Sequence, residues 1–232
     1  RGDLGVEMPP EAVPIIQRDL VERCRHAGKP VIVATQMLES MISSPRPTRA
    51  EVSDVSSAVF LGADAVMLSA ETAAGSYPVQ SVQMMDRVAR QVESWQLMDG
   101  GFRSITEDDE EVKTGLPMSP RQAIARATAQ LSRDLRVRAI AVRTQNGRSA
   151  HIVSATRPAA PIVAITMEES VARSLNLYWG VLSRIVSEDA FLNPSTSARE
   201  NIIDLGLGEE GQSILLLTGF GKNEPMVNVL TV

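Results

Sequence analysis

The segment 29–40 restricts the fold more than any other part of this sequence, because a short apolar run in it ends abruptly in polar side chains. The run Val31–Ala34 is rich in β-branched residues, which is typical of a strand buried on both faces. A hydroxyl, an amide and a carboxylate come soon after it, on Thr35, Gln36 and Glu39. In α/β proteins, ligands and catalytic groups lie at the carboxyl ends of such strands. We therefore expect a functional site where this strand ends.

Two other segments place polar groups in the same way. In residues 1–7, Asp3 is flanked by glycines, which favours a loop at a strand end. In residues 63–72, an expected strand at 65–68 is followed by three polar side chains, those of Ser69, Glu71 and Thr72. Because the carboxyl ends of parallel strands meet at one edge of a sheet, these polar ends predict one shared site.

Helical periodicity alternates with these strands over the first hundred residues. Apolar residues at helical spacing predict a helix over 10–27, a second over 51–61 and a long third helix that ends near residue 98. Thr48 and Glu51 have the spacing of a capping box at the start of the second helix. The alternation of strands and helices implies parallel strands.

The periodicity breaks at residues 99–117, where two glycines and an acidic run predict a linker. Residues 118–232 then have the pattern of a second, smaller α/β domain with a doubly wound sheet. Its expected helices begin near residues 119, 149, 168 and 195. Its expected strands cover 139–142, 162–165, 182–186 and 214–217, with an edge strand at 226–232.

Composition excludes several classes of function for this 232-residue chain. A net charge of −5 and a pI near 5.2 argue against a general nucleic-acid surface, although they leave room for a local phosphate site. Cys24 is the single cysteine, so no intramolecular disulfide forms, and with two histidines the chain is poor in zinc ligands. It has no apolar run of membrane-spanning length and no signal peptide. We therefore expect a cytoplasmic protein without membrane or nucleic-acid partners. The chain lacks an initiator Met and opens inside a polar motif, so we expect the C-terminal part of a longer protein.

Four blocks resemble the signature segments of the pyruvate kinase family and follow its order: Arg1–Glu7, Lys29–Ser40, Pro47–Glu51 and Met67–Thr72. The resemblance extends over the whole chain and is most specific in residues 1–80. It implies an α/β fold in which 1–98 form the last strands and helices of a (β/α)8 TIM barrel. It implies that 118–232 form a small regulatory domain. The family's catalytic lysine, its second metal-binding carboxylate and its K+ ligands would then lie upstream, and we expect residues 1–232 alone to be inactive.

The family transfers a phosphoryl group from phosphoenolpyruvate to ADP, giving ATP, and then protonates the enolate to pyruvate in glycolysis. The resemblance implies that Asp3 binds Mg2+ (or Mn2+) and that the amides of Gly2 and Asp3 receive the substrate carboxylate. It implies that Thr35 helps to protonate the enolate, with Ser69 and Glu71 in the same proton relay. The plainer alternatives are a turn at Asp3 and a hydrogen-bonded cap at Thr35.

The loop 144–149 is a second candidate site, because it joins an expected strand to an expected helix. Backbone amides at a helix N-terminus, hydroxyls and an arginine together favour phosphate. The residues concerned are Thr144, Asn146, Gly147, Arg148 and Ser149. The resemblance implies a sugar-phosphate effector at this loop, although the family more often has Ser at the position of Asn146. A solvent-exposed turn is the alternative.

Other departures from the family's usual pattern occur at Ala70, where Gly is usual, at Ala74, where Lys is usual, and in the loop 219–225. The resemblance also implies a homotetramer. A different class of function stays open from the residues alone: a non-catalytic chain that binds a phosphorylated metabolite through its second domain.

Overall fold

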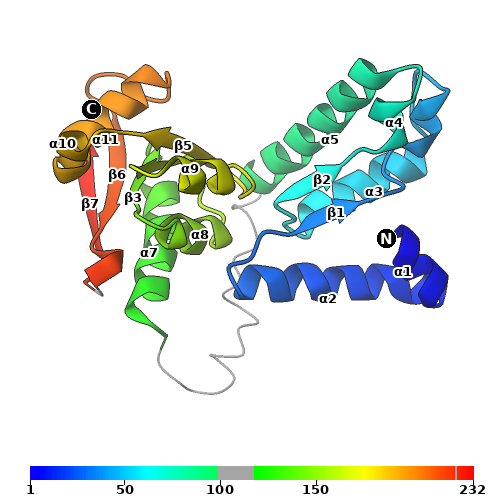
Figure 1. The fold of residues 1–232 in the computed structure, drawn as a ribbon, viewed down its shortest axis with the longest axis horizontal. Helices are drawn as coiled ribbons and strands as arrows, with labels where there is room; N and C mark the ends of the chain where they lie inside the picture. The colour runs from blue at the N-terminus through cyan, green and yellow to red at the C-terminus, as the bar shows by residue number, and fades with distance from the viewer. Residues whose placement is uncertain (99–117, 223) are drawn as a thin grey trace. The chain divides into compact units, whose positions relative to one another are not determined.

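The computed structural model describes residues 1–98, 118–222 and 224–232, and the expected linker at 99–117 lies outside them. The chain divides near residue 100 into two compact units (Figure 1). Each unit is described by itself.

The first unit is a two-stranded parallel sheet with helices. Its elements are α1 (Gly2–Glu7), the 3-10 turn η1 (Pro10–Ala12), α2 (Val13–His26), β1 (Ile32–Ala34), η2 (Glu39–Ile42), α3 (Arg49–Phe60), β2 (Ala65–Met67), α4 (Ala70–Ala73) and α5 (Pro78–Met98). Strands β1 and β2 run parallel, with Val33 opposite Val66. The predicted strands, their direction and the helices between them are thus confirmed.

Two local predictions for this unit are wrong. Asp3 lies in the first turn of helix α1 and not in a loop. A negative charge there suits the helix N-terminus, and the helix stops at Met8 because the residue before a proline avoids helical backbone. Strand β1 is buried on one face only, since Val33 is buried while Ile32 is 48% exposed.

The core of the first unit lies between this sheet and helices α3 and α5. Val33, Met37, Met41, Val55 and Met85 are all buried in one cluster. The capping box predicted at the start of α3 is present, because Thr48 accepts the Glu51 N–H and Glu51 accepts the Thr48 N–H. This cap fixes where α3 begins, just after the polar end of β1.

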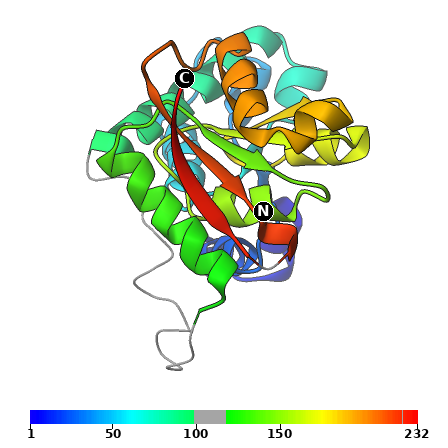
Figure 2. The same cartoon turned by 90° about the vertical axis from the view of Figure 1, so that its left-hand side faces the viewer.

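The second unit is built on a five-stranded sheet. Its elements are α7 (Pro120–Asp134), β3 (Ile140–Arg143), α8 (Arg148–Ala155), β4 (Ile162–Thr166), α9 (Glu169–Leu175), β5 (Val181–Ile185), α10 (Glu188–Leu192), α11 (Pro194–Asp204), β6 (Ser213–Thr218), η4 (Phe220–Lys222) and β7 (Met226–Thr231). The strand order is β5-β4-β3-β6-β7. The first four strands in this order are parallel, and β7 pairs antiparallel with β6 along an edge of the sheet (Figure 2).

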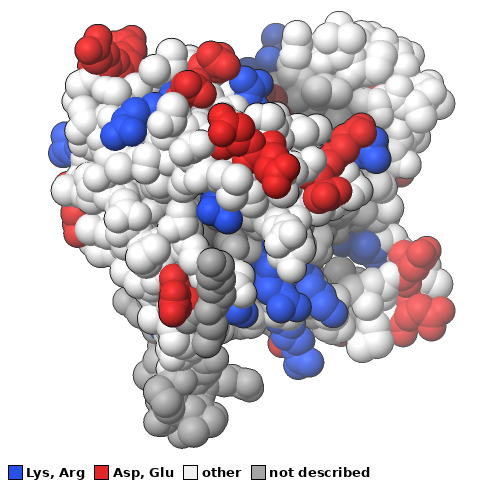
Figure 3. Space-filling model, turned by 60° about the vertical axis from the view of Figure 1, so that its left-hand side comes forward, with Lys and Arg blue, Asp and Glu red and all other residues white. Residues whose placement is uncertain are grey.

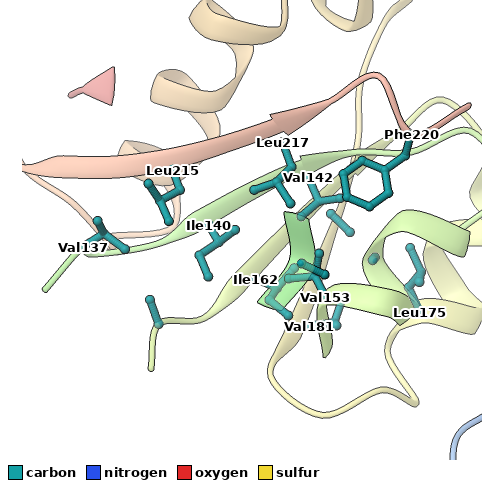
Figure 4. Packing of buried hydrophobic residues seen from close by; sticks show 14 residues of the cluster. Val137, Ile140, Val142, Val153, Ile162, Leu175, Val181, Leu215, Leu217 and Phe220 are labelled. Atoms are coloured by element: carbon teal, nitrogen blue, oxygen red, sulfur yellow. The ribbon is translucent and has the colours of Figure 1, made fainter. Parts of the chain in front are cut away.

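Helices cover both faces of this sheet, as predicted for a doubly wound fold. Ile140 and Val142 of β3 point into a core that includes residues of α7, α8 and α9 (Figure 4). Ala139 and Ala141 alternate with them and belong to a second core with residues of α10 and α11. The alternation follows from the period of two residues in a strand.

Acidic and basic side chains both occur on the face drawn in Figure 3. Among the described residues, no helix is both long enough and apolar enough to cross a membrane.

Candidate functional site

The polar end of β1 has an unusual backbone conformation. Thr35 and Gln36, which directly follow the strand, have φ angles of 69° and 53°. A left-handed conformation is uncommon for residues other than glycine, and for a β-branched residue such as threonine it is an outlier. It costs on the order of 1–3 kcal/mol per residue and persists only where surrounding contacts impose it. Such residues often mark functional sites.

The side chain of Thr35 is held by the start of α1. The Gly2 N–H donates to Thr35 Oγ1 at 2.8 Å, across 33 positions of sequence. Because the hydroxyl oxygen accepts this bond, its own proton remains able to donate elsewhere. A Cβ at position 2 would lie 3.4 Å from Thr35 Oγ1, an ordinary van der Waals contact, so this bond does not itself require glycine. The structure therefore brings together Gly2 and Thr35, two of the predicted site residues.

Arg1 also contacts this turn, although no pattern in the sequence indicated the contact. Its Nε and Nη2 atoms donate to the Thr35 carbonyl at 3.2 and 2.9 Å, and Nη2 donates to the Gln36 carbonyl as well. Its Nη1 atom pairs with Asp54 Oδ2 of α3 at 3.0 Å. The Arg1 side chain is only 13% exposed. One guanidinium thus joins the strained turn to α3.

Glu71 joins the ends of the two strands. Its carboxylate is buried, and Oε1 accepts the Leu38 N–H at 3.1 Å while Oε2 accepts the Ser69 N–H at 2.7 Å. Ser69 itself is exposed. Among the described residues no hydrogen bond links Thr35 with Ser69 or Glu71. The geometry thus gives Glu71 a positioning role, in which both carboxylate oxygens hold backbone amides.

Glu51 binds the segment that follows β1 to the N-terminus of α3. It accepts the Ser40 N–H at 2.7 Å, the Ser40 hydroxyl at 2.6 Å and both the amide and the hydroxyl of Thr48. Burial alone would raise the pKa of this carboxyl, but the hydrogen bonds from Ser40 and Thr48 outweigh it and lower the pKa below its ordinary value of 4.5. Glu51 is therefore a charged capping residue.

Asp3 is the predicted metal ligand in this unit. Its carboxylate is exposed on the first turn of α1, and a carboxylate oxygen is the kind of ligand that Mg2+ and Mn2+ take. Within the described residues, no three acidic, histidine or cysteine side chains gather in a way that would hold a metal ion. Asp3 is thus compatible with the ion as one ligand among several.

The predicted phosphate loop lies between β3 and α8. Gly147, at the N-terminus of α8, has a φ of 83°, and its N–H donates to the Thr144 hydroxyl at 3.0 Å. Asn146 Oδ1 accepts the Arg148 N–H at 3.2 Å. Asn146 and Arg148 are exposed, whereas Thr144 is buried. The loop therefore exposes Arg148 at the start of α8, while the Gly147 and Arg148 amides are already bonded within the loop.

Ser149, the last of the predicted loop residues, lies within α8 and is buried. His151, which the sequence did not single out, lies one helical turn from Gly147 and stacks on Tyr178 at 3.9 Å between ring centres. Among the described residues its buried Nε2 atom has no hydrogen-bond partner. Burial, and then the charge of Arg148, lower the pKa of His151 from 6.5.

The order of the strands places this loop at a preferred binding position. From β3 the chain adds β4 and then β5 on one side of β3, and it then crosses back to add β6 on the other side of β3. The order of the strands therefore reverses direction between β3 and β6. Ligands of doubly wound sheets bind outside the carboxyl ends of the strands at such a point. The loop after β6 also begins here, at Gly219, where a Cβ would lie 1.9 Å from the Glu224 carbonyl oxygen. Only glycine fits that position.

Comparisons with known proteins place both units in one family. Residues 1–82 match the family model described as "Pyruvate kinase, barrel domain", and residues 122–232 match "Pyruvate kinase, alpha/beta domain". Together the two matches cover most of the chain.

Individual relatives agree with these matches. A pyruvate kinase of Sporosarcina psychrophila is 50% identical over 181 residues, which are 78% of this chain and 30% of that protein. One of Agrobacterium vitis is 44% identical over 221 residues, which are 95% of this chain and 45% of that protein. The crystal structure of a pyruvate kinase from Cryptosporidium parvum superimposes with a TM-score of 0.82 at 33% identity, over 99% of this chain and 45% of that one. The chain thus spans less than half the length of these relatives.

Proposed function

This chain belongs to the pyruvate kinase family, and on that basis we propose that the protein containing it transfers the phosphoryl group of phosphoenolpyruvate to ADP. The observation that carries the proposal is the turn at the end of β1. It holds the Thr35 hydroxyl against the Gly2 N–H at the N-terminus of α1, the helix whose first turn contains Asp3. The predicted TIM-barrel and doubly wound α/β architecture agrees with this family.

The proposed reaction has two steps. The bond between phosphorus and the enol oxygen of phosphoenolpyruvate breaks, and a bond forms to a terminal β-phosphate oxygen of ADP, which gives ATP and the enolate of pyruvate. The enolate then gains a proton at its terminal carbon and becomes pyruvate. Each step needs a different kind of assistance, since the first concentrates negative charge and the second requires a proton donor.

Gly2 and Asp3 are proposed to serve the first step. Asp3 would hold Mg2+ or Mn2+ together with ligands from another part of the polypeptide, and the family's K+ ligands are expected there too. The bound cation would neutralise negative charge on the phosphoryl group. Of the two amides proposed for the substrate carboxylate, the Gly2 N–H donates to Thr35 Oγ1, which leaves the Asp3 N–H at the start of α1 for that role.

Thr35 is proposed to serve the second step. Its hydroxyl accepts the Gly2 N–H, which stabilises the oxygen as its own proton moves toward the enolate carbon. Threonine is a weak acid, so a water molecule would restore the proton. Ser69, with its exposed hydroxyl, remains a candidate for this relay. We assign Glu71 to positioning, because both of its oxygens already bind amides.

For the second unit we propose a regulatory role, in which the loop 144–149 binds the phosphate of a sugar-phosphate effector. Arg148 supplies the charge and charged donors from an exposed position at the start of α8, since the Gly147 and Arg148 amides already donate to Thr144 and Asn146. We also propose a homotetramer, as membership of the family implies, and β7, an edge strand that exposes Met226 and Val229, offers a surface for a contact between copies. The proposed setting is glycolysis in the cytoplasm.

An assay of the complete polypeptide tests this function. We expect it to convert phosphoenolpyruvate and ADP to pyruvate and ATP in the presence of Mg2+ and K+. We expect Asp3→Asn to reduce this rate strongly and to raise the Mg2+ concentration required. A complete polypeptide that binds sugar phosphates but makes no ATP from phosphoenolpyruvate would instead support the non-catalytic alternative.

A further inference from the structure

The strained turn at Thr35 and Gln36 requires something to hold it. Neither residue is glycine, and two successive φ angles of 69° and 53° turn both carbonyl groups away from the usual strand direction. Residues in such backbone conformations relax unless their neighbours fix them. The contacts that fix this turn therefore decide where the Thr35 hydroxyl lies.

The Arg1 guanidinium makes the charged contacts to this turn. It donates to the Thr35 carbonyl through Nε and Nη2, and to the Gln36 carbonyl through Nη2. The planar fork suits two adjacent carbonyl oxygens, and hydrogen bonds from a charged donor are stronger than neutral ones. The third nitrogen, Nη1, pairs with Asp54, which links the guanidinium to α3.

From these contacts we propose that Arg1 is a positioning residue for proton transfer, acting through the backbone of Thr35. This inference rests on the function proposed above. Arg1 holds the carbonyl of Thr35 while the Gly2 N–H holds its hydroxyl, so two consecutive residues fix one threonine at both ends. Loss of the fork releases the turn and moves the hydroxyl, even though Arg1 itself touches no reacting atom.

The proposal separates Arg1 from a purely structural arginine. A structural residue would affect phosphoryl transfer and proton transfer equally, through loss of folded protein. A residue that acts through Thr35 affects proton transfer much more than phosphoryl transfer, and its effect on proton transfer disappears once the Thr35 hydroxyl is gone. Displacement of a catalytic group by about 1 Å is enough to slow a step roughly a hundredfold.

The test uses the complete polypeptide with Arg1→Gln and Arg1→Lys, each with and without Thr35→Val. Two rates are measured: exchange of pyruvate methyl protons with solvent deuterium, and ATP formation from phosphoenolpyruvate and ADP. We expect Arg1→Gln to slow exchange roughly tenfold to a hundredfold and ATP formation much less, with Arg1→Lys between it and wild type. In the Thr35→Val background the same substitution should have no further effect on exchange.

Arg23→Gln is the matched control, because Arg23 is an exposed arginine of the same unit that pairs with Asp19. It should leave both rates unchanged. Equal loss of both rates in Arg1→Gln, or an undiminished effect in the Thr35→Val background, would overturn the proposal.

A crystal structure of the Arg1→Gln protein tests the same idea without activity. We expect Thr35 or Gln36 to leave the left-handed region. If both keep their φ angles, Arg1 does not hold the turn and the proposal fails. This structure shows whether Arg1 holds the turn even if the wild-type protein makes no ATP. Absence of ATP formation by the wild-type protein would reject the proposed function and not the role of Arg1 in holding the turn.

Discussion

The Glu71 carboxylate accepts the backbone N–H of Leu38 at 3.1 Å, so a side chain placed after β2 holds the segment that follows β1. The same carboxylate accepts the Ser69 N–H. Because Glu71 is buried, water does not readily take its place as the acceptor for these two amides. Loss of the carboxylate would therefore leave both N–H groups without a partner, at a cost in stability. The two polar strand ends are therefore fixed relative to one another by one carboxyl group.

Glu71→Gln should destabilise the protein, because the side-chain amide offers one acceptor oxygen and turns an N–H group toward the other donor. We expect a loss of about 1–3 kcal/mol in the free energy of unfolding. Urea denaturation measures it. Glu22→Gln, at an exposed ion pair with Arg18, is the control and should change stability by less than about 0.5 kcal/mol. Equal effects of the two substitutions would remove the positioning role of Glu71.

Thr35→Val in the complete polypeptide should slow protonation of the enolate more than phosphoryl transfer. The hydroxyl is lost while Asp3 is untouched, and a loss of about 2–4 kcal/mol in the barrier for proton transfer is expected. Exchange of the pyruvate methyl protons measures this step. Thr35→Ser keeps the hydroxyl and should retain most of the rate. Unchanged exchange in Thr35→Val would exclude the residue from proton transfer.

Arg148→Ala should weaken activation by a sugar phosphate by tenfold or more, which corresponds to about 1.5–3 kcal/mol for a charged hydrogen bond. The concentration needed for half-activation is measured at low phosphoenolpyruvate. Turnover at saturating substrate should change little. Arg173→Ala, at an exposed ion pair with Glu169 in the same unit, is the matched control. If the wild-type and Arg148→Ala proteins require the same concentration, the loop is not the effector site.

Phosphate bound at this loop should raise the pKa of His151. In the free protein, burial and the charge of Arg148 lower this pKa from 6.5, and a bound anion would offset the arginine's charge. Titration of the His151 ring by NMR, with and without sugar phosphate, measures the change, with the His26 signal as a reference. If the pKa of His151 does not change at a saturating concentration of sugar phosphate, the phosphate binds elsewhere.

Glu51→Gln should destabilise the protein by about 1 kcal/mol at pH 7, as expected for loss of a charged cap. The pKa of Glu51 is lower in the folded protein than its ordinary value of 4.5, so its contribution is present above that value and is lost as the pH falls through the folded pKa. The difference in unfolding free energy between wild type and variant should therefore shrink below pH 4.5. A difference that stays constant from pH 7 to pH 3 would contradict this assignment.

Local sequence patterns were sufficient to predict most of the framework. The apolar runs around Val33 and Ile140 predicted parallel strands, and the Thr48–Glu51 spacing predicted the cap of α3. These features depend on residues close in sequence or on the period of a strand. The same patterns also placed Thr35 directly after a strand and Arg148 at the start of a helix, which is where the structure has them.

The contacts that shape the candidate site were not predictable in this way. Arg1 and Thr35 are 34 residues apart, and their contact depends on how the chain folds between them. The left-handed turn at Thr35 and Gln36 contains no glycine, so the sequence does not indicate it. Tertiary contacts impose this backbone conformation against the local preference of both residues. His151 was missed because nothing near it in sequence indicates its stack on Tyr178.

Small and branched residues alternate along the segment 139–142, and this alternation affects which substitutions the segment can accept during evolution. Ala139 and Ala141 are wholly buried on the face that packs with Phe191 and Ala198, so a longer side chain there would press on these neighbours. On the opposite face Ile140 and Val142 meet other branched side chains, whose volumes can change in compensation. A larger residue is therefore costly on one face of this segment, whereas residues on the other face can exchange volume with one another over time.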